Sequence, residues 1–451
     1  MSDLIKIKRG VDIKLVGQAE QIYATVDQAD SFAIKPSDFN GFKAKLLVKE
    51  GDEVKAGSPI LFDKNKESVK ICAPVSGEIT EIVRGEKRRL VAIRILADKE
   101  VKFVDFGKAD PNSLDAEAVK DKLLNSGCWP LIKQRPYNIV ANPERSPKAI
   151  FISCFDTSPI SPDMDFVVHG MDKEFQTGID AIRKLTEGKV YLGVDAKTNP
   201  SSVFTSCKGV EIKKFNGPHP AGNVGVQIHN IDPINKGEYV WTLSPQDIII
   251  IGRLFLEGKY DSQINIAVTG SEVNKPRYYK TRTGASVKNF LASNVSDAKL
   301  RYISGNVLTG TRINSDGYLG FYDRQITVIP EGDEEEFFGW ISPGLNKFSI
   351  SRAMFSWMMP NKKYALDSGM HGEERAFVVT GEYEKVFPFD IFPVQLLKAI
   401  MVRDLEAMEN LGIYEVVEED FALCEVVCTS KIPVQETVRE GLDLMLNELG
   451  D

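Results

Sequence analysis

The order of apolar patterns between residues 149 and 195 is the feature that most constrains the fold. A β-rich run at 149–153 is followed by apolar residues at helical spacing in 178–185, and then by a second β-rich run at 189–195. A strand, a helix and a strand in this order form a right-handed crossover between parallel neighbours. The sequence therefore predicts a parallel α/β layer, in which ligands bind beyond the carboxyl ends of the strands.

Asp195 ends the second of these predicted strands, so it stands where a functional residue can lie. Aspartate in such a place also begins turns and caps helices. We favour the turn or cap role for Asp195 and keep ligand contact as the alternative.

The first hundred residues have the pattern of short strands and tight turns. The segment G-D-E-V-K-A-G at 51–57 is followed by A-P-V-S-G-E-I at 73–79 and by alternating apolar residues at 90–95. This spacing resembles that of the biotinyl/lipoyl-like barrel-sandwich domains. Carrier domains of that kind have an acylated lysine on an exposed hairpin. Lys64 lies in this region without the flanking residues of a carrier, so we expect a surface lysine.

A second small β unit is predicted within residues 256–330. A strand pattern at 264–268 is followed by a turn, a helix opening at 284–287 and another strand pattern at 301–304. This order resembles the soluble-ligand-binding β-grasp domain. Ser286 is the expected N-cap of the helix.

The C-terminal part is predicted to be mainly helical after the acidic run at 331–336, which we interpret as a solvated boundary loop. One helix face lies between Pro393 and Gly412, and a final helix spans 434–449. The apolar face of the helix between Pro393 and Gly412 consists of Val394, Leu397, Ile400, Met401, Leu405 and Met408. The methionines near Trp357 form an apolar stripe that either faces a partner or belongs to the core, and we favour the core: Met354, Met358 and Met359.

These patterns divide the chain of 451 residues into four parts. We predict an α/β multidomain fold. It consists of a barrel-sandwich hybrid domain at 1–105, a Rossmann-like α/β domain at 106–255, a β-grasp domain at 256–330 and a mainly helical domain at 331–451.

Charge and apolar content exclude several classes of protein. The chain has 56 Lys and Arg against 64 Asp and Glu, a net charge of −8, which disfavours nucleic-acid binding and opposes direct adsorption to anionic lipid. No stretch approaches the roughly 18 apolar residues of a membrane span, and no apolar leader precedes residue 10. Six cysteines are too few for a disulfide scaffold. We expect a cytosolic chain with reduced thiols.

The motifs of common catalytic and metal sites are absent from the sequence. It contains no Gly-rich nucleotide fingerprint, no lysine-bearing phosphate loop, no G-x-S-x-G elbow, no H-E-x-x-H and no C-x-x-C. We therefore predict no catalytic residue and no metal ligand in this chain.

Several separated blocks agree, in order, with one family: residues 5–13, 217–222, 273–277 with 281–286, 337–340, 372–376 and 418–424. In this order they resemble the NqrA subunit of the bacterial sodium-translocating NADH:quinone oxidoreductases. The resemblance implies a complex that oxidises NADH, reduces ubiquinone or a related quinone, and exports sodium across the inner membrane. It also implies that flavins and an iron–sulfur centre belong to other subunits. This chain would be a peripheral subunit on the cytoplasmic face, partnered by the integral and peripheral subunits of that complex.

Flavin-bearing relatives of this architecture have a glycine-rich loop after the first barrel. Here the corresponding stretch, 125–131, keeps one glycine and contains Trp129. Iron–sulfur relatives have four-cysteine runs near the C-terminus, whereas only Cys424 and Cys428 are present here. We therefore expect no redox cofactor on this chain and interpret both cysteines as small buried residues.

Two histidines are the candidate quinone contacts. His219 lies in a Pro/Gly-rich loop at 217–222, and His229 follows the alternating apolar residues of 224–228. A quinone site needs hydrogen-bond donors for two carbonyls in an apolar cleft. The candidate set is His219, Gly222, His229 and Asp195. The favoured alternative is that each histidine only holds a crowded loop together; His371 is a weaker candidate.

Two functions remain open. The first is a peripheral subunit of a redox-driven sodium pump, itself without catalytic residues; quinone is bound either by this chain or wholly by a membrane subunit, and we favour the membrane subunit. The second is a free-standing soluble ligand-binding protein that uses the same barrel and β-grasp domains. Association with membrane subunits distinguishes them, because only the first requires it.

Overall fold

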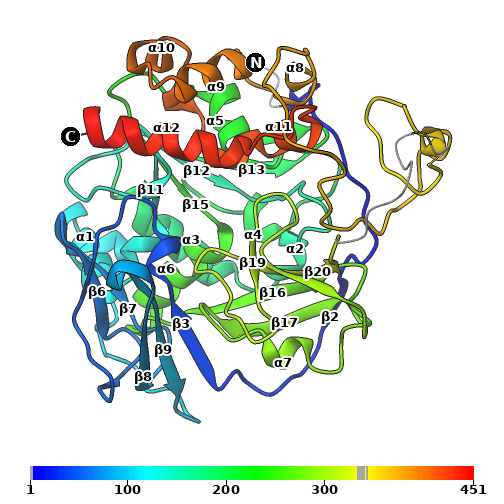
Figure 1. The fold of residues 1–451 in the computed structure, drawn as a ribbon. Coiled ribbons are helices and arrows are strands. Elements are labelled where there is room, and N and C mark those ends of the chain that lie inside the picture. Colours follow the sequence, from blue (N-terminus) through cyan, green and yellow to red (C-terminus); the bar gives the residue numbers. More distant parts are fainter. Residues whose placement is uncertain (1–3, 333–340, 342–343, 451) are drawn as a thin grey trace.

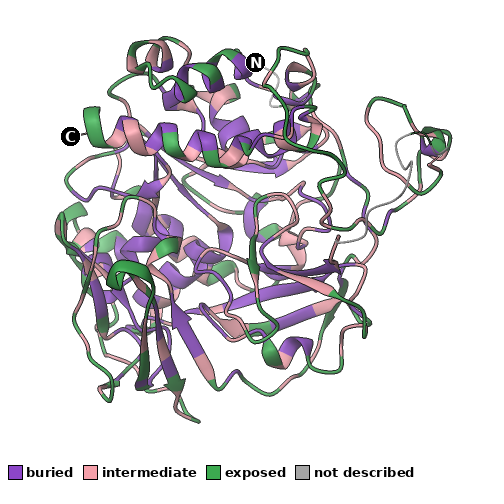
Figure 2. Cartoon of the chain, in the orientation of Figure 1, coloured by how far each residue is buried: buried purple, intermediate pink, exposed green. Residues whose placement is uncertain are grey.

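The computed structural model describes residues 4–332, 341 and 344–450, which form four β-sheets with helices around them (Figure 1). No helix among these residues is both long enough and apolar enough to cross a membrane. Buried side chains fill the sheets and the helix faces turned toward them (Figure 2).

The largest sheet is the predicted α/β layer. Its seven strands lie in the order β1-β14-β13-β12-β15-β10-β11, and neighbours from β1 to β15 are parallel, whereas β10 and β11 pair antiparallel. The predicted strands at 149–153 and 189–195 are β12 and β13, with the predicted bounds. The strand bounds are β1 Leu4–Lys6, β10 Lys133–Arg135, β11 Ile139–Val140, β12 Ala149–Ser153, β13 Lys189–Asp195, β14 Glu211–Asn216 and β15 Val240–Leu243.

Two helices, α3 (Asp172–Arg183) and α6 (Pro245–Glu257), pack side by side against this sheet. Their close approach depends on glycine, because a Cβ at Gly178 would lie 2.1 Å from the Ile248 oxygen. A Cβ at Gly252 would likewise lie 1.8 Å from the oxygen of Glu174. The shorter helices of this part are α1 Ala116–Ser126, α2 Met164–Val167, α4 Ser202–Thr205 and α5 Val224–Ile231.

The alternating residues of 224–228 form part of helix α5, not an extended segment. This helix packs on β12 from the side of the C-terminal helices (Figure 1). It is buried on more than one side, so apolar residues occupy several faces and the spacing of 3.6 is hidden.

The predicted barrel-sandwich domain is two small sheets packed together, with strand orders β3-β9-β8-β5 and β4-β6-β7. Lys64 is exposed on the turn between β6 and β7, as predicted. The bounds are β3 Ser31–Ile34, β4 Ala44–Leu46, β5 Glu53–Val54, β6 Pro59–Asp63, β7 Lys66–Cys72, β8 Gly77–Arg84 and β9 Leu90–Ala97.

The β-grasp region forms most of a six-stranded sheet with the order β19-β18-β20-β16-β17-β2. Helix α7 (Lys288–Leu291) begins after Val287, so Ser286 is not its N-cap. The bounds are β2 Glu20–Tyr23, β16 Gln263–Thr269, β17 Arg277–Arg282, β18 Leu300–Ser304, β19 Thr311–Ile313 and β20 Gln325–Pro330.

The N-terminal residues leave the barrel and join other sheets. β1 pairs with β14 of the α/β sheet, and β2 pairs with β17 of the six-stranded sheet. Residues far apart in the sequence therefore share both sheets, and the domain boundaries given above stay a prediction.

The C-terminal helices are α8 Tyr383–Val386, α9 Pro393–Met401, α10 Leu405–Asn410, α11 Ala422–Val427 and α12 Val434–Leu449. Helix α12 has the predicted bounds. The predicted helix between Pro393 and Gly412 is divided into α9 and α10, because Arg403 has a φ of 57° and Asp404 caps α10. Met401, expected on its buried face, is 46% exposed.

Two further predictions for this region are wrong. Met358 is 55% exposed, and Met354 and Met359 are half-buried, so these methionines are not a core stripe. Glu331 is not solvated, since its side chain is 5% exposed and pairs with Arg301 and Arg312. Residues 333–336 of the acidic run lie outside the described residues.

Candidate functional site

A cavity of about 500 Å³ opens at the carboxyl edge of the α/β sheet, between the ends of β12 and β15. β12 is followed in sequence by β13 on one side, and the chain later crosses to β15 on the other side. This reversal is the topological switch point at which open α/β sheets bind ligands. Residues from 37–40, 131–138, 162–164, 219–224, 305–325 and 418–419 also line the cavity.

His219 lies on one wall of this cavity within a short hydrogen-bond chain. The Gly222 N–H donates to Thr157 Oγ1 at 2.9 Å, and Thr157 Oγ1 lies 3.1 Å from His219 Nδ1. Thr157 Oγ1 accepts from the Gly222 N–H, so its own proton is assigned to the hydrogen bond with His219 Nδ1. The neutral imidazole then carries its proton on Nε2. Burial lowers the pKa of His219 to about 4, against the opposing effect of the Asp12 carboxylate. The imidazole is therefore a neutral donor at pH 7.

The loop after β12 carries a second polar group on the same side. Asp156 Oδ1 accepts a hydrogen bond from the Ser158 N–H at 2.7 Å, and burial raises the pKa of the Asp156 carboxyl. Ser158 is 7% exposed, and its Oγ makes no hydrogen bond of good geometry among the described residues, although it lies near enough to the Asp156 carboxyl to act on the pKa of that group in the lowering direction. A buried hydroxyl without a partner is uncommon in folded proteins.

Arg324 forms part of the facing wall. Its Nη2 pairs with Asp247 Oδ1 at 2.8 Å, and its Nη1 donates to the Phe321 and Asp323 oxygens at 3.0 Å. Asp247 also closes the capping box of α6 with Ser244, which fixes its position. Within the described part of the chain, Arg324 Nε remains without a partner although the residue is only 8% exposed.

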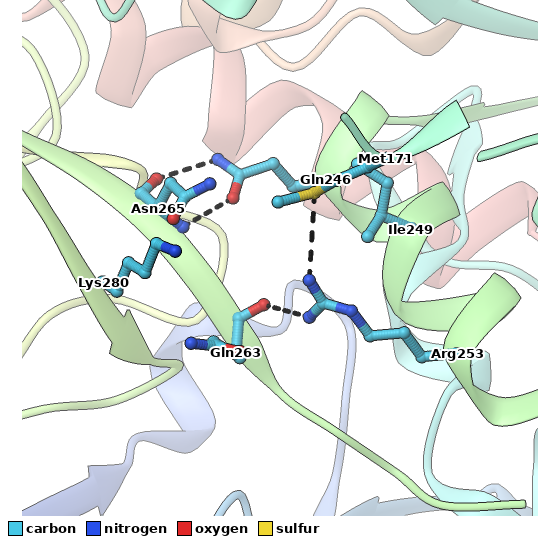
Figure 3. Close-up of a pocket in the computed structure, with 7 residues that line it drawn as sticks. All are labelled: Met171, Gln246, Ile249, Arg253, Gln263, Asn265 and Lys280. Carbon is cyan, nitrogen blue, oxygen red and sulfur yellow. Dashed lines mark hydrogen bonds between the residues drawn. The ribbon is translucent and has the colours of Figure 1, made fainter. Parts of the chain in front are cut away.

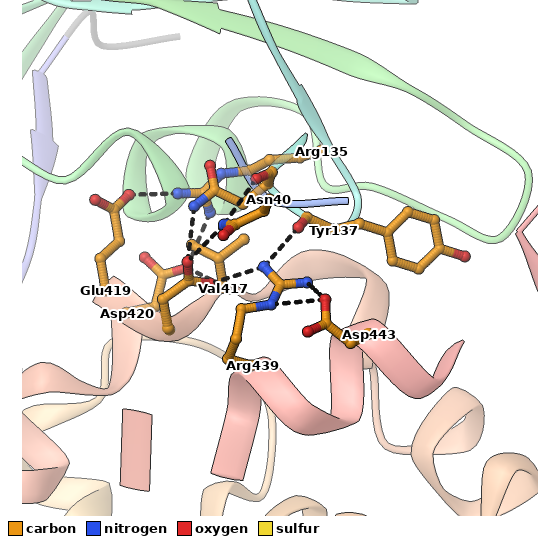
Figure 4. A network of polar contacts seen from close by, with 10 residues as sticks. Asn40, Arg135, Tyr137, Val417, Glu419, Asp420, Arg439 and Asp443 are labelled. Atoms are coloured by element: carbon orange, nitrogen blue, oxygen red, sulfur yellow. Dashed lines mark hydrogen bonds and ion pairs between the residues drawn. The ribbon is translucent and has the colours of Figure 1, made fainter. Parts of the chain in front are cut away.

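A buried ion pair closes the third side, between the sheet and the C-terminal helices (Figure 4). Arg135 Nη1 lies 2.9 Å from Asp420 Oδ2, and Arg135 Nη2 lies 2.5 Å from Glu419 Oε1. Burial raises the pKa of the Asp420 carboxyl, while the Arg135 charge acts in the opposite direction. Nearby, Arg439 donates to the Tyr137 oxygen and binds Asp443.

The structure brings together only two of the four candidate quinone contacts. His219 and Gly222 line the cavity, whereas His229 and Asp195 do not. His229 Nε2 accepts from the Asp390 N–H at 3.1 Å, and its Nδ1 lies 2.8 Å from Glu415. These contacts agree with the alternative in which the histidine only holds the local structure together.

Asp195 and His371 also have local partners. Asp195 Oδ1 accepts from the Lys197 N–H at 2.9 Å, which is the turn role favoured from the sequence. The exposed His371 lies 3.0 Å from Asp367.

The stretch at 125–131 is occupied by packed side chains. Trp129 is fully buried, donates to the Ala141 oxygen at 2.8 Å and contacts Trp241 edge-on. Cys424 and Cys428 are buried, as predicted, and burial raises the pKa of the Cys424 thiol well above its usual range. The described residues hold no cluster of three or more potential metal ligands.

A second cavity, of about 30 Å³, lies between α6 and β16 (Figure 3). Gln246 and Asn265 exchange two hydrogen bonds there, at 2.9 and 2.7 Å, and Arg253 donates to the Gln263 oxygen at 2.9 Å. This space accommodates about one water molecule and no organic ligand.

Sequence reasoning missed Ser158 and Arg324. Ser158 lies just beyond the carboxyl end of the first predicted strand, so the rule applied to Asp195 also indicated residues 154–158. No sequence signal placed Arg324 opposite that loop, because Arg324 directly precedes β20, a strand of the six-stranded sheet.

Known proteins are similar to this chain over nearly its whole length. Family profiles match three regions: "NqrA N-terminal barrel-sandwich hybrid domain" at 5–98, "NqrA second alpha/beta domain" at 114–260 and "NQRA C-terminal domain" at 265–315. A relative from Alcanivorax borkumensis, named as the A subunit of a Na(+)-translocating NADH-quinone reductase, is 38% identical over 97% of this chain and 98% of its own. Relatives of the same name from Yersinia pestis and Rhodopirellula baltica are 37% and 38% identical, over 97% and 98% of this chain and 98% of their own lengths.

Proposed function

The chain belongs to the NqrA family of the Na(+)-translocating NADH-quinone reductases, and we propose that it is a peripheral subunit of such a complex that contacts quinone. Its near full-length match to relatives of that name supports a role in the whole complex. We place it on the cytoplasmic face of the bacterial inner membrane, bound to integral subunits. NADH oxidation, flavins and the iron–sulfur centre are assigned to other subunits.

The quinone headgroup is proposed to bind in the cavity at the switch point. The observation that carries this proposal is that Ser158 and Arg324 both line this cavity and that each has a buried side-chain donor, Oγ and Nε, without a hydrogen-bond partner among the described residues. A buried donor without an acceptor costs about 1–3 kcal/mol, and a ligand oxygen removes that cost. A quinone presents two carbonyl oxygens that only accept hydrogen bonds, so it is complementary to a cavity whose side chains offer donors.

The size and the polarity of the cavity support a flat organic headgroup. Its volume of about 500 Å³ falls in the range of small-molecule sites. Neutral His219 adds a third donor, and Phe155, Leu243 and Phe321 supply apolar surface for ring contact. The proposed contacts are therefore Ser158, Arg324, His219 and Gly222, while Asp195 and His229 keep structural roles.

Gly222 is required by the backbone as well as by the ligand. A Cβ at this position would lie 2.7 Å from the Thr157 nitrogen. A larger side chain would therefore displace the hydroxyl that orients His219.

The test is a titration of the purified full-length chain with a short-chain, water-soluble ubiquinone analogue, in which calorimetry measures the heat of binding. We expect saturable binding that Ser158→Ala weakens about threefold to tenfold, the effect of losing one hydrogen bond. His229→Ala is the matched control, since His229 lies outside the cavity lining. Absence of saturable binding in the parent chain, or equal losses in both variants, contradicts the proposed site.

Assembly is tested separately. An affinity-tagged chain should be recovered with integral membrane subunits from solubilised bacterial membranes. Recovery of the chain alone under conditions that keep the complex intact would instead support a free-standing ligand-binding protein.

A further inference from the structure

Exposed apolar side chains are concentrated in the C-terminal quarter of the described residues. Of 19 exposed large hydrophobic residues, 13 lie at residue 341 or beyond, and none lies between 97 and 332. An exposed apolar patch of this kind marks an interaction surface. The most prominent part is the segment 344–363, which we call the basic apolar loop.

The basic apolar loop differs in charge from the rest of the chain. It contains Lys347, Arg352, Lys362 and Lys363 and no aspartate or glutamate, although the whole chain has a net charge of −8. Charges farther away than about 8 Å are screened at physiological salt, so a surface approaching the loop meets local positive charge. The average charge of the chain therefore does not decide what this segment binds.

Three large apolar side chains at the tip of the loop are exposed. Phe355, Trp357 and Met358 are 52%, 51% and 55% exposed and lie on one short 3₁₀ turn. The Arg352 guanidinium lies 6.0 Å from the centre of the Trp357 ring, so a cation accompanies the exposed indole. Figure 2 shows most of this segment as exposed or intermediate, and Figure 1 shows it standing away from the sheets.

The end of the loop is held to the body of the protein. The Tyr364 N–H donates to the Lys14 oxygen at 2.8 Å, and the Val16 N–H donates to the Tyr364 oxygen at 3.0 Å. Lys14 Nζ also donates to the Pro360 oxygen at 2.8 Å. These three hydrogen bonds fix the C-terminal end of the loop to the N-terminal segment.

We propose that the basic apolar loop inserts Phe355, Trp357 and Met358 into the headgroup layer of an anionic phospholipid bilayer. Aromatic side chains favour this layer, and lysine and arginine favour its anionic surface. Charge complementarity selects lipid over a protein partner, because lysine is depleted at the centres of protein interfaces. One such loop gives reversible contact, which orients a chain that the complex already holds near the membrane.

This inference rests on the proposed function only for the presence of a bilayer nearby, and it does not depend on quinone binding. Pure lipid vesicles therefore test it apart from the complex. Loss of quinone binding with intact vesicle binding would contradict the proposed site alone.

The experiment uses the full chain carrying Trp340→Phe. Trp129 and Trp241 are buried, so Trp357 reports the environment of the loop. Vesicles of phosphatidylethanolamine with phosphatidylglycerol should shift its emission to the blue and sediment the protein, more at low salt than at high salt. Vesicles of phosphatidylcholine should do neither.

Matched variants locate the contact by co-sedimentation. Phe355→Ser with Trp357→Ser, and separately Lys363→Gln, should each lower partitioning into anionic vesicles by about fivefold or more. Val91→Ser with Leu96→Ser removes two exposed apolar residues from the barrel and should change nothing. Equal binding to neutral vesicles, or equal losses in the barrel variant, overturns the proposal. Binding only to vesicles that contain the integral subunits also overturns it and assigns the loop to a protein partner.

Discussion

Arg135 and Asp420 are 285 positions apart in the sequence, and their side chains meet at 2.9 Å in the interior of the protein. The arginine is on β10 of the α/β sheet, and the aspartate lies in the 3₁₀ turn Glu418–Phe421 directly before α11. Arg135 is 1% exposed and Asp420 is 2% exposed, so each charge depends on the other for compensation.

Asp420→Ala should destabilise the protein by about 3–5 kcal/mol, because it leaves Arg135 as a buried charge with one remaining partner. The measurement is urea unfolding followed by circular dichroism. Lys236→Ala removes an ion pair with Glu409 in which the lysine side chain is 71% exposed, and should cost at most about 1 kcal/mol. Similar costs for both variants would mean that the buried pair contributes little.

Stability should depend on pH through His219. Its pKa is about 4 in the folded protein against 6.5 for the free group, so the unfolded chain binds more protons between these values. The contribution of His219 is complete above pH 6.5 and is lost as the pH falls toward 4, by about 2–4 kcal/mol. His219→Gln should flatten this part of the stability curve. The exposed His371→Gln is the control, and a slope that survives His219→Gln would refute the assignment.

Gly127 and Gly51 form a matched pair of glycines with positive φ, 81° and 87°. Alanine at either costs about 1–2 kcal/mol for the left-handed backbone. A Cβ at Gly127 would also lie 2.5 Å from the Cβ of Cys72, whereas nothing lies within 4 Å at Gly51. Gly127→Ala should therefore cost about 1–3 kcal/mol more than Gly51→Ala in thermal unfolding. Equal melting temperatures would show that the Cys72 region can move aside.

Ser158→Ala should leave the ligand-free protein as stable as the parent, or slightly more stable. The hydroxyl that it removes is buried and has no partner in the described structure, so its loss relieves a desolvation cost of about 1 kcal/mol. Differential scanning calorimetry with and without the quinone analogue separates the two effects. A clear loss of stability without ligand would show that the hydroxyl has a structural partner.

Local patterns predicted the regular elements well where one period dominated. The strand at 189–195 and the helix at 434–449 have the predicted bounds. The strand has a buried apolar centre, and the helix has one buried apolar side. The methionines near Trp357 were misjudged, because they are apolar without being fully buried.

The candidate site depended on information that local patterns do not contain. Asp195 and Ser158 both lie at or just beyond the carboxyl ends of parallel strands, yet only the end of β12 borders the switch point. The difference follows from where the chain places β15, which is decided by long-range packing. His219 and Gly222 were found because a Pro/Gly-rich loop with histidine was visible in the sequence, whereas Arg324 enters from another sheet.

The pairing of β1 with β14 and of β2 with β17 determines the order in which this protein can mature on the ribosome. The first strands to leave the exit tunnel must wait for partners that are synthesised about 200 and 250 residues later, at 211–216 and 277–282. Until then, residues 4–23 are an unpaired segment that nascent-chain chaperones can bind. The barrel of residues 31–97 can close earlier, so in this part of the chain a later segment folds before the strands that precede it.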